Sequence, residues 1–332
     1  MESHLRSWLN AFHQQTQDAP LNANAARDGL KLLTQQYQCQ DIAAVHTTDT
    51  MIANSTIPCR IYQPLTLHHA HSAPALSLDT DCPVTLFFHG GGHLAGNIEV
   101  YDSISRQLAH ASQSIVITID YRLAPEHPYP AGLNDGRHSL YNVFTTLDKA
   151  NIPYQRSLRV LGDSAGGAMA ATLIQEWGFR SCPLKGKIDK LVLIYPSLDY
   201  TMSAPSLAQY GSGHLLEKKK IAWYFEQYFV PYEDRYHASP LFGQINQDHP
   251  ETLVITAQYC PIKDDGRRYY DRLITHGVHA RYLELPNSIH AFLNLYQLQQ
   301  EACDHSYAAI NKFLNAPKKA LPLTDTITQQ EE

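Results

Sequence analysis

The sequence lacks the marks of several protein classes. No apolar run is long enough to span a bilayer, and none follows the opening residues Met1 to His4, so we expect neither a membrane anchor nor a secretory signal peptide. The 332 residues carry 26 Lys and Arg against 32 Asp and Glu, a formal net charge of -6. Because there is no basic excess to neutralise phosphates, nucleic acid is not expected as a partner.

The cysteines are few and scattered. None of the six forms a C-x-x-C pair, and without a secretory signal this pattern predicts reduced thiols in a cytoplasmic protein. The histidine-rich residues 65–81 hold His68, His69 and His71 but no Cys or acidic residue at ligand spacing, which favours a solvated loop over a metal site. The chain after Ala316 is predicted to be poorly ordered.

What the sequence does have is a repeated alternation of short apolar runs and helical segments. The runs are of the kind that is buried on both faces of a parallel sheet. The alternation predicts an α/β fold with a mostly parallel sheet between helices. Strands are expected at residues 84–88, 115–119, 158–161, 191–194, 253–256 and 279–285, and helices at 103–111, 134–149, 165–177 and 266–276.

Two regions interrupt this alternation. Residues 1–40 predict helices before any strand, and residues 200–240 form a long aromatic-rich insertion after the fourth strand. Such an insertion can cover the carboxyl ends of the strands, where open α/β sheets bind ligands, but its aromatic residues can equally form a core of its own. We therefore expect an α/β core of residues 41–315 with both regions as a helical cap, followed by a flexible tail of residues 316–332.

The strongest local motif is G-D-S-A-G-G at residues 162–167, which follows a predicted strand and opens a predicted helix. This is the G-x-S-x-G nucleophile elbow in the context that it requires, with Ser164 as the nucleophile. The serine hydroxyl must stand above the sheet on a sharp turn, and the flanking glycines leave room for that turn. A helix N-terminus also favours developing negative charge. Taken alone, the motif also fits a glycine-rich turn without chemistry.

A second glycine-rich motif follows the first of these strands. His89 and Gly90 open the sequence H-G-G-G, where backbone N–H groups can approach a reacting carbonyl oxygen. The N–H groups of Gly91, Gly92 and Ala165 are the candidate donors of an oxyanion hole. Two motifs in this chain order, each after its own strand, predict a hydrolase.

The candidate general base comes late in the chain. The chain order in this architecture is serine, acid, histidine. Among 18 histidines, His290 stands just after the last predicted strand, where a base can reach the serine. His93, beside the glycine-rich loop, is expected to pack rather than to react.

Three motifs together resemble the bacterial esterases of the hormone-sensitive-lipase type, and among these the cytoplasmic acetyl esterases. They are H-G-G-G at 89–92, D-Y-R-L-A-P-E at 120–126 and the elbow, and the similarity covers roughly residues 40–315. The resemblance implies an α/β-hydrolase fold with a helical cap, hydrolysis of short acyl esters and no cofactor. It implies structural roles for Arg122 and Glu126, and it leaves an oligomer or a regulatory protein partner open.

The chain departs from this family at the triad acid. The family pattern T-A-G-x-D-P-L reads T-A-Q-Y-C-P-I here, so Cys260 stands where the resemblance places the carboxylate. Three hypotheses follow: a Ser–His dyad of lowered rate, a substitute acid, or a Cys260 thiolate. The candidate substitutes are Asp199, after the fourth strand, and Asp264 and Asp265, which also fit the capping of the next helix.

The missing acid also allows the opposite interpretation, in which the fold has become a binding or regulatory module. An active esterase is favoured, because the serine, the histidine and the oxyanion loop are all retained and no structural need explains the full set. An amide or peptide hydrolase is less favoured, because harder leaving groups suffer most from a poor base.

Overall fold

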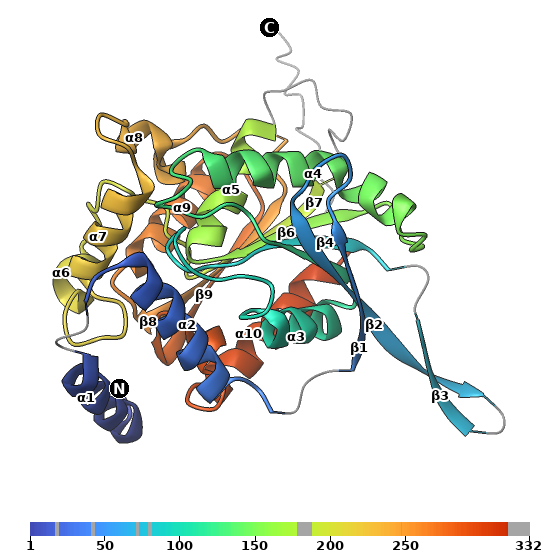
Figure 1. Ribbon diagram of the computed structural model, residues 1–332, viewed down its shortest axis with the longest axis horizontal. Helices are drawn as coiled ribbons and strands as arrows, with labels where there is room; N and C mark the ends of the chain where they lie inside the picture. Colours follow the sequence, from blue (N-terminus) through green and yellow to red (C-terminus); the bar gives the residue numbers. More distant parts are fainter. Residues whose placement is uncertain are drawn as a thin grey trace, which may run out of the picture.

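A nine-stranded sheet runs through the centre of the computed structural model (Figure 1). Eight strands lie in the order β1-β2-β5-β4-β6-β7-β8-β9, and β3 extends the sheet by pairing with β2. The structure describes residues 1–16, 20–40, 44–70, 73–78, 82–177, 188–246 and 248–317. Most of the tail predicted to be flexible therefore lies outside the described residues.

All six predicted strands are present, and they form the parallel part of the sheet. The residues of β4, β5 and β6 are buried throughout, which is why their sequences read as continuous apolar runs rather than as alternating patterns. The prediction of a mostly parallel sheet is confirmed. These strands are β4 (Val84–Phe88), β5 (Ile115–Ile119), β6 (Leu158–Asp163), β7 (Ile188–Ile194), β8 (Glu251–Tyr259) and β9 (Ala280–Ile289).

The antiparallel edge of the sheet was not predicted. It consists of β1 (Val45–Met51), β2 (Pro58–Ala70) and β3 (Ala73–Leu78), with β2 antiparallel to β1, β3 and β5. The predicted loop at residues 65–81 is thus wrong where β2 and β3 form a hairpin that projects from the molecule (Figure 1). Leu and Thr or Ser alternate along both strands, and the histidines obscured this strand pattern. His71 and the side chains of His68 and His69 lie outside the description.

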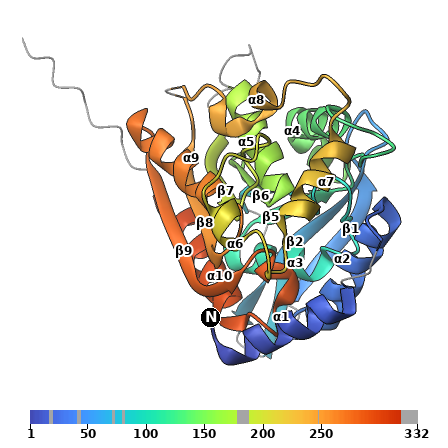
Figure 2. The same cartoon turned by 90° about the vertical axis from the view of Figure 1, so that its left-hand side faces the viewer.

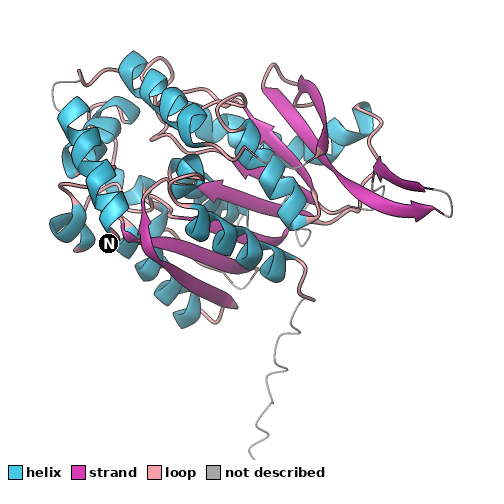
Figure 3. Cartoon of the chain, turned by 90° about the horizontal axis from the view of Figure 1, so that it is seen from below, coloured by secondary structure: helices cyan, strands magenta, loops and turns pink. Residues whose placement is uncertain are grey.

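Helices cover both faces of the sheet (Figures 1 and 3). On one face α3 (Asp102–Ser112) packs with α10 (Gln300–Leu314). The other face carries α4 (Ala131–Lys149), α5 (Ala165–Trp177) and α9 (Lys263–Thr275). The four predicted helices are confirmed, whereas α10 was not predicted. Within the described ranges, no helix has the length and apolar character to cross a membrane.

The inserted segment between β7 and β8 holds three short helices near the ends of the parallel strands (Figure 2). Phe225 and Tyr228 of this segment belong to the main hydrophobic core, so its aromatic residues do not form a separate core. The helices are α6 (Ser206–Tyr210), α7 (Lys218–Tyr228) and α8 (Arg235–Ala238).

The N-terminal helices are α1 (Ser3–Thr16) and α2 (Ala23–Tyr37). A small second core forms where Leu5 and Leu9 of α1 pack with Ile289, at the end of β9, and with Leu295. The first helix is thereby attached to the last strand of the sheet.

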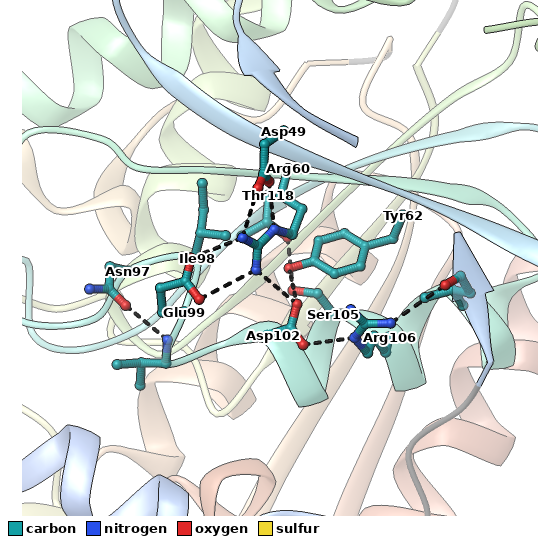
Figure 4. A network of polar contacts seen from close by, with 12 residues as sticks. Asp49, Arg60, Tyr62, Asn97, Ile98, Glu99, Asp102, Ser105, Arg106 and Thr118 are labelled. Atoms are coloured by element: carbon teal, nitrogen blue, oxygen red, sulfur yellow. Dashed lines mark hydrogen bonds and ion pairs between the residues drawn. The ribbon is translucent and has the colours of Figure 1, made fainter. Parts of the chain in front are cut away.

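An ion-pair network ties the antiparallel edge to the start of α3 (Figure 4). The guanidinium of Arg60 on β2 lies 2.6 Å from Asp49, 2.9 Å from Glu99 and 3.1 Å from Asp102. Asp102 also pairs with Arg106, one turn further along α3. Each exposed pair contributes little to stability, but together they fix the segment that follows the glycine-rich loop.

Candidate active site

The nucleophile elbow is a strained turn between β6 and α5. Ser164 has a φ of 50°, in the left-handed region that non-glycine residues rarely adopt. A Cβ on Gly162 would lie 2.2 Å from the carbonyl oxygen of Gly166, and one on Gly166 would lie 2.0 Å from that of Phe88. No side chain fits at either position, so the glycines of the motif are what allows this turn to form.

The candidate base lies within reach of the serine. His290 directly follows β9, and its Nε2 atom is 2.9 Å from the Oγ atom of Ser164. The imidazole also packs against the ring of Tyr195. Burial lowers the pKa of His290 to about 3, so the imidazole is neutral at pH 7 and can accept a proton.

Cys260 contacts the other nitrogen of this histidine. Its Sγ atom lies 3.2 Å from Nδ1 of His290, and the side chain is fully buried. The other described cysteines are likewise buried, while Cys182 lies outside the description. Burial raises the pKa of the Cys260 thiol and lowers that of the imidazole, so it opposes the ion pair that the thiolate hypothesis needs.

The structure gives the three candidate substitute acids other partners. The carboxylate of Asp199 accepts hydrogen bonds from the amides and hydroxyls two and four residues later, and from Arg268 at 3.0 Å. Asp264 and Asp265, in the first turn of α9, accept backbone N–H groups of neighbouring segments. None of the three has a hydrogen bond to His290 in the described structure, so the structure brings only the thiol to that side of the imidazole.

The glycine-rich loop presents backbone N–H groups beside the elbow. Gly91 has a φ of 116° and Gly92 a φ of 66°, and Ala95 closes the turn by donating to the Gly91 carbonyl at 2.9 Å. Gly91 takes this conformation because it has no Cβ. Among the described residues, none accepts a hydrogen bond from the N–H groups of Gly91, Gly92 or Ala165, so all three are available as donors to an oxyanion.

Residues predicted to be structural have packing and ion-pair contacts. Arg122 forms a two-point contact with Asp135, and Glu126 pairs with Arg27 of α2. His93 is buried and stacks on an aromatic ring of α7 at 3.8 Å. These observations agree with the roles expected from the sequence.

Two side chains at the site were missed. Asp163 accepts a hydrogen bond from the N–H of Gly90, and its position just before the nucleophile was the available signal. Tyr224 of α7 lies so close to Gly92 that a Cβ there would be 2.8 Å from its ring. No sequence signal pointed to that contact, because it joins residues from separate parts of the chain.

The fold and the elbow define an α/β hydrolase, and comparison with known proteins agrees. A family model described as the α/β-hydrolase fold matches residues 85–294. The chain therefore belongs to the α/β-hydrolase family, within the hormone-sensitive-lipase-type esterases that its motifs resemble.

The relatives and the similar structures include several named esterases. An ethyl acetate hydrolase of Pseudomonas putida is 30% identical over 249 residues, 74% of each chain. The carboxylesterase NlhH of Mycobacterium tuberculosis is 30% identical over 271 residues, 78% of this chain and 79% of its own. An esterase of the archaeon Pyrobaculum calidifontis has a TM-score of 0.78 at 29% identity, covering 95% of this chain and 99% of that one. An ester hydrolase from the metagenome of Lake Arreo has a TM-score of 0.81 at 29% identity, covering 95% and 98%.

Proposed function

We propose that the chain is a serine carboxylesterase that hydrolyses short-chain, acetyl-type esters through an acyl-enzyme. The observation that carries this proposal is the 2.9 Å contact between Ser164 Oγ and His290 Nε2, beside backbone N–H groups with no acceptor among the described residues. The names of the relatives, an ethyl acetate hydrolase and a carboxylesterase among them, support the same reaction.

The proposed reaction has two acyl-transfer steps. Ser164 Oγ attacks the ester carbonyl while its proton passes to Nε2 of His290, and the N–H groups of Gly91, Gly92 and Ala165 bind the oxyanion. The intermediate collapses, and the imidazolium returns the proton to the leaving alcohol. Water then attacks the acyl-enzyme with the same base, which releases the carboxylic acid and restores the serine.

The neutral thiol of Cys260 weakens the base side of the site, where His290 accepts the proton of Ser164. A thiol that donates to Nδ1 leaves the proton of the imidazole on Nε2, where it blocks transfer from Ser164. A thiol that accepts from Nδ1 leaves Nε2 open, but it provides no negative charge to stabilise the imidazolium. Loss of the acid lowers the rate of a serine protease by about 10⁴, so we propose a dyad enzyme that turns over activated or small esters slowly.

The preference for short acyl groups is supported by an aromatic ring of α7 that packs against the oxyanion loop. The ring of Tyr224 lies against Gly92, with a Cβ built there only 2.8 Å from its nearest ring atom. A ring packed against this glycine leaves little room for an acyl chain to extend past the loop toward α7.

An assay on p-nitrophenyl acetate and butyrate tests the proposal, with Ser164→Ala as the matched control. We expect wild-type hydrolysis well above that of Ser164→Ala, by at least about 10² even if the missing acid removes much of the triad's rate. Turnover of the wild type no faster than that of the folded Ser164→Ala variant would reject the esterase and favour a binding module.

A further inference from the structure

A second carboxylate lies next to the nucleophile, on its oxyanion side. Asp163 is almost fully buried at the end of β6. Its Oδ1 atom accepts the backbone N–H of Gly90 at 2.6 Å, and its Oδ2 atom accepts the hydroxyl of Tyr101 at 3.2 Å. The residue before the serine is thus bonded to the loop that carries the oxyanion donors.

The glycine-rich loop fits closely against this carboxylate. A Cβ on Gly90 would lie 2.5 Å from Asp163 Oδ2 and 2.9 Å from the hydroxyl of Tyr101. The preceding residue, His89, is held too, because its carbonyl accepts the hydroxyl of Tyr121 at 2.6 Å. The loop therefore has fixed contacts immediately before the two glycines whose N–H groups face the reaction.

Within the described part of the chain, the carboxylate has no ion pair that explains its burial. Among the described residues, no Lys or Arg contacts it, and burial raises its pKa to about 7 despite the hydrogen bond from Gly90. An unpaired buried carboxylate destabilises a fold, so a role in stability alone does not account for it. The titratable groups that face it are Tyr101 at the start of α3, Tyr121 after β5, Tyr195 after β7 and Tyr307 of α10.

We propose that Asp163 is a positioning residue for the oxyanion hole, whose carboxylate holds Gly90 and thereby places the N–H groups of Gly91 and Gly92 relative to Ser164. This proposal rests on the proposed esterase function. Oxyanion donors act mainly on the transition state, so loosening the loop lowers kcat and leaves KM nearly unchanged.

The two hydrogen bonds of Asp163 also make the site sensitive to the protonation of this carboxyl. A protonated carboxyl turns one of the two acceptor oxygens of Asp163 into a donor, so it cannot accept from both Gly90 and Tyr101 at once. The protonated carboxyl keeps an acceptor for the Gly90 N–H, as Asn does. With a pKa of about 7 for Asp163, kcat therefore falls as the pH falls through 7, but by no more than the small loss expected for Asp163→Asn. His290 does not produce this step, because its pKa is lowered to about 3.

The experiment measures kcat and KM on p-nitrophenyl acetate from pH 5 to 9 for the wild type, Asp163→Ala, Asp163→Asn and Tyr101→Phe. Asp163→Ala should lose up to about 10²- to 10³-fold in kcat at pH 8, the range of a lost oxyanion donor, with little change in KM. Asp163→Asn retains an acceptor for the Gly90 N–H, so it should recover most of that loss but lack the step near pH 7. Tyr101→Phe keeps the bond to Gly90 and should lose less than Asp163→Ala.

Two results would overturn the assignment. One is a folded Asp163→Ala variant with wild-type kcat. The other is an Asp163→Asn variant that keeps the wild-type step near pH 7, which remains a test if the alanine variant does not fold. Failure of the esterase function is a separate result, because it shows as wild-type turnover no faster than that of Ser164→Ala.

Discussion

The two sides of Ser164 differ in the buried group that supports them: the oxyanion side has a carboxylate, and the base side has a thiol. On the oxyanion side, Asp163 is bonded to the loop of Gly90 at 2.6 Å. On the base side, His290 meets the thiol of Cys260 at 3.2 Å, where the family places an acid. The difference teaches that the groups that hold the transition-state charge and the groups that move the proton can change independently on this fold.

Restoring the acid on the base side should have the largest effect. Cys260→Asp places a carboxylate beside Nδ1 of His290, fixes the productive tautomer and stabilises the imidazolium. We expect kcat on p-nitrophenyl acetate to rise by about 10² to 10⁴ at pH 8. An unchanged kcat in a folded variant would mean that the base side is already complete without this carboxylate.

Removing the thiol of Cys260 tests whether the base side depends on the sulfur atom. In a dyad enzyme, Cys260→Ala should change kcat by less than about tenfold, because a neutral thiol bonds only weakly to the imidazole. The measurement is kcat beside the Cys260→Asp variant, with the melting temperature as a check on the small cavity created. A loss as large as that of Ser164→Ala would show instead that the sulfur takes part in the reaction.

On the oxyanion side, the ring of Tyr224 should control the length of the acyl group. Tyr224→Ala removes the ring that lies against Gly92, and we expect the ratio of kcat/KM for butyrate to that for acetate to rise about tenfold. Tyr236→Ala, which changes an exposed ring on α8, is the matched control and should leave the ratio unchanged. Equal ratios for wild type and Tyr224→Ala would place the acyl chain elsewhere.

The smallest predicted effect is on stability, with opposite signs for the two sides. The pKa of Asp163 is raised from 3.8 to about 7, so its contribution to stability is lost as the pH rises through that range. The pKa of His290 is lowered from 6.5 to about 3, so its contribution is lost as the pH falls. The difference in melting temperature between Asp163→Asn and wild type should therefore increase by a few degrees as the pH is raised from 5 to 8. The difference between His290→Gln and wild type should increase as the pH is lowered from 7 to 4. Parallel slopes for the two variants would contradict both assignments.

The sequence predicted the parts of the site that local patterns encode. The parallel strands follow from apolar runs, and the elbow follows from glycines around Ser164 that leave room for one turn. The antiparallel edge was missed because its alternation is short and interrupted by histidines. The contacts of Asp163 with Gly90 and of Tyr224 with Gly92 could not be predicted, because each depends on how separate segments pack. Cys260 was placed only by its register with the family pattern.

The contact between α1 and the end of β9 has a consequence for the order of events during synthesis. Leu9 is made 280 residues before Ile289, its partner in the second core. At about 5–20 residues per second, the ribosome needs roughly 14–56 s to supply that partner. The part of the first helix that packs on Ile289 and Leu295 therefore stays uncovered while most of the chain is made, and chaperones that bind nascent chains have this interval to act on it.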